Sequence, residues 1–120
     1  MKKISMILAA VTIISCCLCF VSCSKEDKLY EECIEILADS LIDPTSLLIS
    51  SAESYTDTEN GDIFYKIVYN AKNKLGAYTG NNTIYFKYDA EDEEITSSSI
   101  FKTSFGLCEA SGGKHKVYVD

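Results

Sequence analysis

The first 22 residues constrain the chain more than any other feature. Two lysines follow Met1, and the next 19 residues, 4–22, carry no charge. A basic start, an apolar middle and a small residue before the cut are the parts of a secretory signal peptide. An uncharged stretch of this length could also remain as a membrane-spanning helix, because about 20 apolar residues cross the hydrocarbon core. Serine and threonine interrupt the stretch, which favours a signal peptide over a retained helix.

The tetrapeptide Phe20-Val21-Ser22-Cys23 stands at the end of this segment. It resembles the lipobox of bacterial lipoproteins, in which an apolar pair and a small residue precede a cysteine. The resemblance implies that Cys23 receives a diacylglyceryl group as a thioether and that a signal peptidase cuts just before it. A second box at residues 13–16 (IISC) lies upstream, but a cut there would leave apolar residues 17–21 at the new N-terminus. We therefore expect the lipid on Cys23.

The lipid would decide where the protein works. One acyl chain binds a membrane marginally, whereas two or more hold a protein there stably. We expect a domain on the extracytoplasmic side, anchored to the cell membrane or the outer membrane through Cys23. The predicted division is a signal peptide over 1–22, a lipidated tether over 23–28 and one small domain over 29–120, because about 100 residues is the usual size of one compact unit.

The charge of the exported part excludes nucleic acid as a partner. Nine lysines and eighteen acidic residues remain after a cut before Cys23, so the net formal charge is 9 − 18 = −9. Affinity for DNA or RNA depends largely on cationic groups that displace counterions from phosphates. The chain also contains no arginine, the residue whose planar guanidinium best fits carboxylates and phosphates.

Two cysteines remain after the predicted cut. Cys33 and Cys108 are an even pair in an exported domain, where the environment is oxidising. We expect a disulfide between them, and two ordinary buried thiols are the alternative. With a single histidine in the chain, these cysteines are too few for a structural zinc site, which needs four ligands.

The exported part has the pattern of an α+β domain. From Leu29 to Ile42 the apolar residues recur at spacings of three and four, which predicts a helix that ends before Pro44. Alternating apolar residues then predict strands. These lie at 47–52, 63–72, 83–89, 95–105 and 114–119. One helix packed on an antiparallel sheet of four or five strands is the simplest architecture that buries these faces.

Groups that could carry catalysis are few. The one histidine, His115, lies between two lysines in the last predicted strand, where a solvated position is expected. Neither a serine elbow nor a phosphate-binding glycine loop is present in the sequence. We expect no enzyme, no cofactor and no metal.

The tyrosines and one loop are the best candidates for binding. Six tyrosines lie in or beside the predicted strands, and some should lie on a sheet face that a single helix leaves open. They could bind a partner, or they could pair across strands and only stabilise the sheet. The loop over 73–80 is the strongest candidate, because loops on a rigid scaffold often carry function. Asn73, Lys74 and Tyr78 are its predicted contact residues.

A second and weaker resemblance covers most of residues 29–89. The segments 41–46 (LIDPTS), 68–73 (VYNAKN) and 76–78 (GAY) are similar to small uncharacterised exported or phage-borne bacterial domains. Those domains share an L-x-D-P-x-S turn and an A-K-N-x-x-G-G-Y-like segment. The resemblance implies a domain boundary and carries no activity.

These observations predict a lipid-anchored lipoprotein of the cell envelope whose domain is a non-enzymatic binding module. Its partners would be the membrane, through the lipid on Cys23, and an envelope protein or glycan. The alternative is an inhibitor or immunity factor, similar to a phage-exclusion lipoprotein, that acts on one envelope protein.

Overall fold

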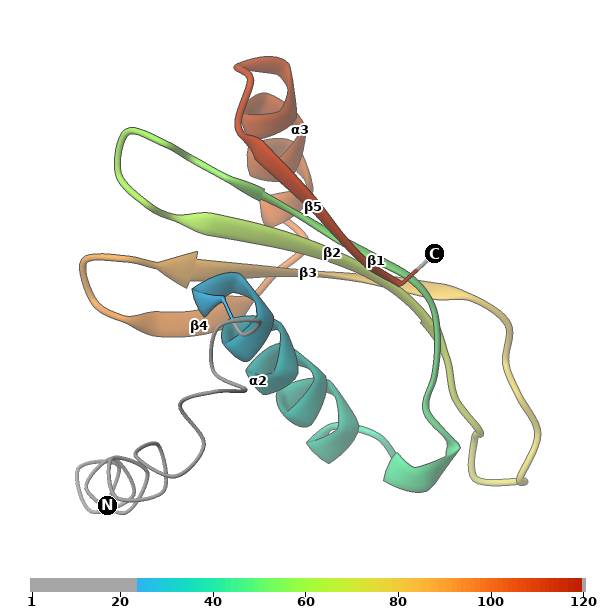
Figure 1. Cartoon of the computed structure of the whole chain (residues 1–120). Coiled ribbons are helices and arrows are strands. Elements are labelled where there is room, and N and C mark those ends of the chain that lie inside the picture. The colour runs from blue at the N-terminus through green and yellow to red at the C-terminus, as the bar shows by residue number, and fades with distance from the viewer. Residues whose placement is uncertain (1–23, 120) are drawn as a thin grey trace, which may run out of the picture.

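The computed structural model describes residues 24–119 (Figure 1). The predicted signal peptide, the lipobox and Cys23 lie outside these residues and stay predictions. The first described residue, Ser24, directly follows Cys23.

Five strands form one antiparallel sheet, in the order β4-β3-β2-β1-β5. Strands β1 to β4 are joined in succession, and β5 returns to pair with the free edge of β1. In chain order the strands are β1 (Leu48–Thr56), β2 (Ile63–Asn70), β3 (Asn82–Asp89), β4 (Glu94–Ser97) and β5 (Lys114–Val119). The positions predicted for β1, β2, β3 and β5 are confirmed, although β1 continues to Thr56.

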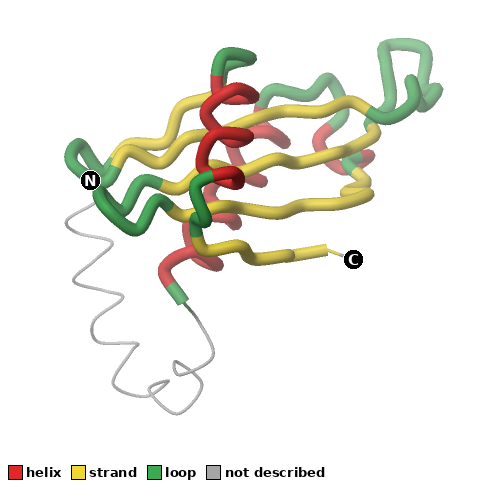
Figure 2. Tube along the Cα trace, turned by 90° about the horizontal axis from the view of Figure 1, so that it is seen from above, coloured by secondary structure: helices red, strands yellow, loops and turns green. Residues whose placement is uncertain are grey.

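Two α-helices within residues 24–119 cover the two faces of this sheet (Figure 2). Helix α2 (Lys25–Asp39) lies on one face and helix α3 (Phe101–Ala110) on the other. Successive side chains of a strand point to opposite faces. Accordingly, Phe64 of β2 packs in the cluster of α3, and its neighbour Tyr65 packs in the cluster of α2. The predicted α+β class, with a helix packed on an antiparallel sheet, is confirmed, and α3 is an addition to it.

Helix α2 begins earlier than predicted. Ser24 is its N-cap: the Ser24 hydroxyl accepts the backbone N–H of Asp27 at 3.3 Å, and the Asp27 carboxylate accepts that of Ser24 at 3.4 Å. This reciprocal pair satisfies two N–H groups that a helix start leaves free. The predicted tether over 23–28 is therefore wrong for residues 25–28, which form the first turn of the helix. The helix also ends at Asp39, before the short 3₁₀ helix η1 (Pro44–Ser46).

Strand β5 fixes the start of α2 in place. Lys116 Nζ lies 2.7 Å from Asp27 Oδ1 and donates to the Ser24 hydroxyl at 2.9 Å. Lys114 Nζ lies 3.2 Å from Glu26 Oε2. The two ends of the described chain, α2 and β5, are thus joined by ion pairs at one end of the sheet.

The strand predicted over 95–105 is wrong beyond Ser97. Only β4 is extended, and the chain turns at Ser98 into helix α3. Phe101, Phe105 and Cys108 are spaced four and three residues apart, which places them on one helical face toward the sheet. The change from strand to helix cannot be predicted at the three successive serines 97–99, because serine fits a strand edge and a turn equally well.

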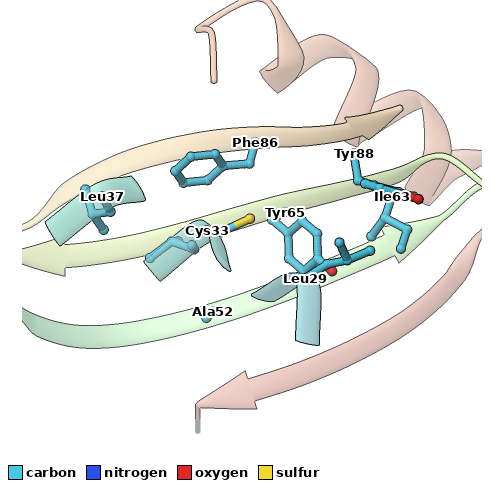
Figure 3. Close-up of a cluster of buried hydrophobic side chains, with 9 residues drawn as sticks. Leu29, Cys33, Leu37, Ala52, Ile63, Tyr65, Phe86 and Tyr88 are labelled. Carbon is cyan, nitrogen blue, oxygen red and sulfur yellow. The ribbon is translucent and has the colours of Figure 1, made fainter. Parts of the chain in front are cut away.

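The α2 face contains the larger core (Figure 3). Cys33 and Leu37 point from the helix toward the sheet, and both are almost completely buried. The Tyr65 hydroxyl donates to the Glu26 carbonyl at 2.8 Å, so its polar end is satisfied. The buried members of this core are Leu29, Cys33, Leu37, Ala52, Ile63, Tyr65, Ile67, Phe86 and Tyr88.

The α3 face contains a smaller core. Its buried residues are Phe64, Phe105 and Cys108. The Tyr55 and Phe105 rings meet edge to face, with their centroids 5.1 Å apart. Partly buried Tyr55, Tyr85 and Phe101 complete this layer.

Candidate functional site

The loop between β2 and β3 is held in one shape by its own hydrogen bonds. Lys72 and Tyr78 form an isolated antiparallel bridge at its base. Asn73 Oδ1 accepts the N–H groups of Leu75 at 2.9 Å and Ala77 at 3.2 Å. The Asn73 N–H donates to the Ala77 carbonyl at 2.9 Å. Asn73, predicted as a contact residue, therefore shapes the turn that carries the other predicted contact residues.

This turn presents an apolar side chain to solvent. Leu75 is 91% exposed, the highest value among the large exposed hydrophobic residues of the described chain. Gly76 follows it with a φ of +79°, a conformation that side chains other than glycine rarely adopt. Lys74 beside it is also exposed, and Lys72 Nζ lies 5.6 Å from the centroid of the half-exposed Tyr78 ring. We call residues 72–78 the loop tip.

The base of the loop is tied to the turn that follows α2. The buried Ser46 hydroxyl accepts the Lys72 N–H at 2.9 Å and donates to the Asp43 carbonyl at 2.7 Å. Two of the segments that carry the weaker resemblance, 41–46 and 68–73, are therefore in direct contact. A shallow groove of about 270 Å³ runs between them. It is lined by Ser40, Leu41, Ile42, Tyr69, Ala71, Lys72, Asn73, Thr79 and Asn82.

The other predicted tyrosines do not form an open binding face. Tyr65 and Tyr88 are buried in the core under α2, and Tyr69 and Tyr118 pack against it. Tyr85 packs against the α3 cluster. The idea of a tyrosine-lined open face is wrong, because α3 covers part of the face that a single helix would have left free.

A cleft beside α3 was not predicted. It has a volume of about 470 Å³, within the range of small-ligand sites. We call it the α3 cleft. Apolar surface comes from Phe64, Leu107 and Cys108, and carboxylates come from Asp57 and Glu59 in the turn between β1 and β2. The complete lining is Asp57, Thr58, Glu59, Phe64, Ser104, Leu107, Cys108, Ser111 and Gly113.

Gly113 allows β5 to pass close to the end of α3. A Cβ atom there would lie 2.6 Å from the Cys108 sulfur and 2.9 Å from the carbonyl oxygens of Cys108 and Thr56. Distances this short exclude any side chain without a shift of the backbone. No sequence signal could have revealed this cleft, because its walls come from segments about 40 residues apart that only the fold brings together.

The predicted disulfide is wrong. Cys33 and Cys108 are both free thiols, and each is buried in its own cluster. The two clusters lie on opposite faces of the sheet, whereas a disulfide requires Cα atoms within about 7 Å of each other. Burial raises the pKa of both thiols, and the Asp57 carboxylate raises that of Cys108 further. Both are therefore protonated and poorly nucleophilic at neutral pH.

His115 lies on β5, as predicted. Its Nε2 is 2.9 Å from Glu53 Oε1 of the neighbouring strand, and its ring stacks on Tyr55 with centroids 4.5 Å apart. Its side chain is 42% exposed. Within residues 24–119, no three histidine, cysteine or acidic side chains converge as a metal site would require.

In the described part of the chain, no helix is both long enough and apolar enough to span a bilayer. Comparisons with protein-family models, with curated proteins and with solved structures find no match to this chain. The candidate sites therefore rest on the chemistry of the loop tip and the α3 cleft alone.

Proposed function

We propose that this chain is a lipoprotein held on the outer side of a membrane by lipid on Cys23, and that its domain is a non-enzymatic binding module. The observation that carries the anchor is the box Phe20-Val21-Ser22-Cys23, which directly precedes the helix cap Ser24. A cut before Cys23 would remove residues 1–22. It would take nothing from the two cores, whose buried members lie between Leu29 and Cys108.

The position of Ser24 adds a geometric consequence. Because the helix cap directly follows the lipid-bearing residue, the domain would be held against the membrane surface at the start of α2, without a free tether. The loop tip lies at the other end of the sheet from the start of α2 (Figure 1). It would therefore be presented away from the point of attachment, where a partner can reach it.

The loop tip is the surface that best fits binding. Its Leu75 is nearly fully exposed although the turn around it is fixed by the N–H groups of Leu75 and Ala77, which donate to Asn73 Oδ1. A fixed turn loses little conformational entropy when it binds, and an exposed leucine beside an aromatic ring gains from burial. The exposed Lys74 and the half-exposed Tyr78 flank this leucine.

The described residues offer little support for catalysis. Both thiols have raised pKa values. His115 already contacts Glu53. It does not line the α3 cleft, which Gly113, just before β5, borders. A nucleophile that a base activates is the usual requirement for covalent catalysis, and neither cleft nor loop combines such groups.

Mass spectrometry of the mature N-terminus tests the anchor. The expected result is a chain that begins at an acylated Cys23, and the Cys23→Ala variant should remain unprocessed. A mature protein that still begins at Met1, or that is acylated elsewhere, would overturn the proposal.

Cross-linking on intact cells tests the binding surface. The double variant Lys74→Ala/Tyr78→Ala should lose its cross-linked partner, whereas the matched variant Lys102→Ala/Ile100→Ala, which removes an exposed lysine and an exposed apolar side chain from the start of α3, should retain it. Equal retention by both variants would remove the loop tip from the proposal. Recovery of one stoichiometric envelope protein would favour the inhibitor or immunity role, and recovery of glycan would favour a general binding module.

A further inference from the structure

The loop tip and the α3 cleft have complementary chemistry. The loop tip combines an exposed leucine with Lys72 and Lys74. The α3 cleft combines the apolar surface of Phe64, Leu107 and Cys108 with the carboxylates of Asp57 and Glu59 and with serine and threonine hydroxyls. An apolar side chain flanked by positive charge thus exists in the same molecule as a mixed cleft that offers both apolar surface and negative charge.

The charge of the loop tip is unusual for this chain. Between Ile63 and Tyr88 there are four lysines and no acidic residue, although the chain carries 18 acidic residues against 11 lysines. Lys87 in this stretch lies 3.8 Å from the carboxylates of Asp62 and Asp89. The lysines of the loop tip are therefore the positive charges that this hairpin can offer to a partner at its far end.

The α3 cleft has the size and walls to take the tip. Its volume of about 470 Å³ exceeds that of a single leucine side chain several times over, so part of the turn can enter with it. Leu107, one of its walls, is 66% exposed and would be covered by such an occupant. Phe64 and Cys108 form deeper apolar surface, since both are buried between α3 and the sheet.

The two features cannot meet within one molecule. The loop tip follows the end of β2 at Asn70, and the cleft borders the turn that precedes its start at Ile63 (Figure 1). The eight residues of β2 span about 26 Å at about 3.3 Å per residue. A loop tip that occupies the cleft must therefore come from a different copy of the chain.

We propose that the loop tip of one copy docks in the α3 cleft of a second copy. This inference rests on the proposed function, because it names the partner of the loop tip. The contact is heterologous: each copy uses a different surface at each end, so the copies form a row that need not close. The association is weak in dilute solution, since the contact is small, and membrane anchoring strengthens it by raising the effective concentration.

Photo-cross-linking of the lipidated protein in phosphatidylcholine–phosphatidylglycerol vesicles tests the docking. A benzoylphenylalanine in place of Leu75 should give a ladder of dimers, trimers and larger species, with the cross-link mapped to the segments 57–64 and 104–113. The same group in place of Ile100, which is 70% exposed but outside the cleft lining, is the matched control and should give no ladder.

Charge exchange provides the second arm. With the photo-cross-linker at position 75, Lys74→Glu should lower the yield about fivefold, the upper limit for one exposed ion pair. Adding Glu59→Lys or Asp57→Lys in the same chain should restore it, because each copy carries both surfaces. Both exchanges are made because Asp57 also accepts the N–H of Glu59 within its own turn, so Asp57→Lys removes that hydrogen bond, whereas Glu59→Lys keeps it.

Three outcomes would overturn the inference: no ladder, dimers cross-linked from tip to tip, or exchange variants that restore nothing. Acylation of Cys23 is measured on the same preparation. A missing ladder with an acylated Cys23 therefore refutes the docking and leaves the proposed anchor intact, whereas a missing acyl group refutes the anchor.

Discussion

The sheet face under α2 and the sheet face under α3 differ in the size of the core that they bury and in the contacts that hold their helices. The α2 face buries nine residues in its core, and the α3 face buries three. Helix α2 has a reciprocal cap at Ser24 and ion pairs to β5, whereas the N-cap of α3 has no side-chain hydrogen bond. The α2 face therefore supplies most of the stability, and the α3 face can leave a cleft open.

The solvent-facing surfaces of the two helices also differ, since that of α2 is acidic and that of α3 exposes an apolar side chain beside the cleft. Helix α2 exposes acidic side chains to solvent, among them Glu31, Glu32 and Glu35, with one large exposed apolar residue, Ile36. Helix α3 exposes Leu107 at 66%, and this side chain lines the α3 cleft. Exposed apolar side chains beside a cleft are typical of a contact surface. The comparison assigns stability to one face and contact to the other.

The largest expected effect compares one leucine from each helix. Leu37→Ala should lower the free energy of unfolding by about 3 kcal/mol, because Leu37 is 1% exposed and leaves a cavity in the main core. Leu107→Ala should change it by less than about 0.5 kcal/mol, because that side chain lies mostly in solvent. Urea denaturation followed by circular dichroism measures both. Equal losses would mean that α3 is as tightly packed as α2, which would break the comparison.

Two glycines at the α3 face should respond with opposite sign. Gly113→Ala should cost about 2 kcal/mol, because its new methyl group would meet the Cys108 sulfur and two carbonyl oxygens at under 3 Å. Gly106→Ala should gain about 1 kcal/mol, because Gly106 lies within α3, nothing lies within 4 Å of its added Cβ, and alanine favours a helix. Thermal denaturation gives both signs. A loss for Gly106→Ala would show that α3 needs a backbone freedom that its packing does not reveal.

The sequence predicts the α2 face much better than the α3 face, for a physical reason. Leu29, Cys33 and Leu37 repeat at intervals of four residues, and residues that face the α2 core recur at every second position of β2. The buried side of both elements can therefore be predicted from the sequence. In the segment 95–105, isoleucine, threonine and serine favour an extended chain, and the helical spacing emerges only with Cys108. A short helix of this kind is stabilised by tertiary packing and not by its own propensity.

The two candidate sites divide in the same way. The loop tip is predictable because Asn73 and Gly76 are turn residues and Lys74 and Tyr78 stand beside them in the sequence. Leu75 lies within the predicted loop 73–80 but is not among its predicted contact residues, although an apolar residue directly before a turn glycine is a usable signal. The α3 cleft is not predictable, since Asp57 and Leu107 meet only after β1 and α3 have packed.

The cap of α2 offers a smaller test. Ser24→Ala should lower the free energy of unfolding by about 1 kcal/mol, because the Asp27 N–H loses its acceptor at the helix start. Ser99→Ala, an exposed serine just before α3, is the matched control and should stay within about 0.5 kcal/mol. Urea denaturation of the two variants gives the difference. Similar losses would mean that α3 also depends on a serine at its start, against the contrast between the helices.

The smallest effect expected is the pH dependence of the ion pair between Asp27 of α2 and Lys116 of β5. The hydrogen bond from Lys116 is the main cause that holds the pKa of Asp27 below its usual 3.8, and the Ser24 N–H adds to it. A lowered folded-state pKa stabilises the fold above the unfolded value, and this contribution is lost as the pH falls through the folded value. Its size should be below about 1 kcal/mol, because the pair is partly exposed.

The Asp27→Asn variant isolates this term from the other carboxylates, which titrate in both proteins. The native protein should be the more stable of the two at pH 6, and the gap should narrow only below pH 3.8, as Asp27 becomes protonated. Unfolding midpoints measured from pH 6 downward give the gap directly. A gap that stays constant, or widens, as the pH falls below 3.8 would place the folded pKa of Asp27 at or above its usual value. It would then remove the ion pair with Lys116 as a distinguishing support of the α2 face.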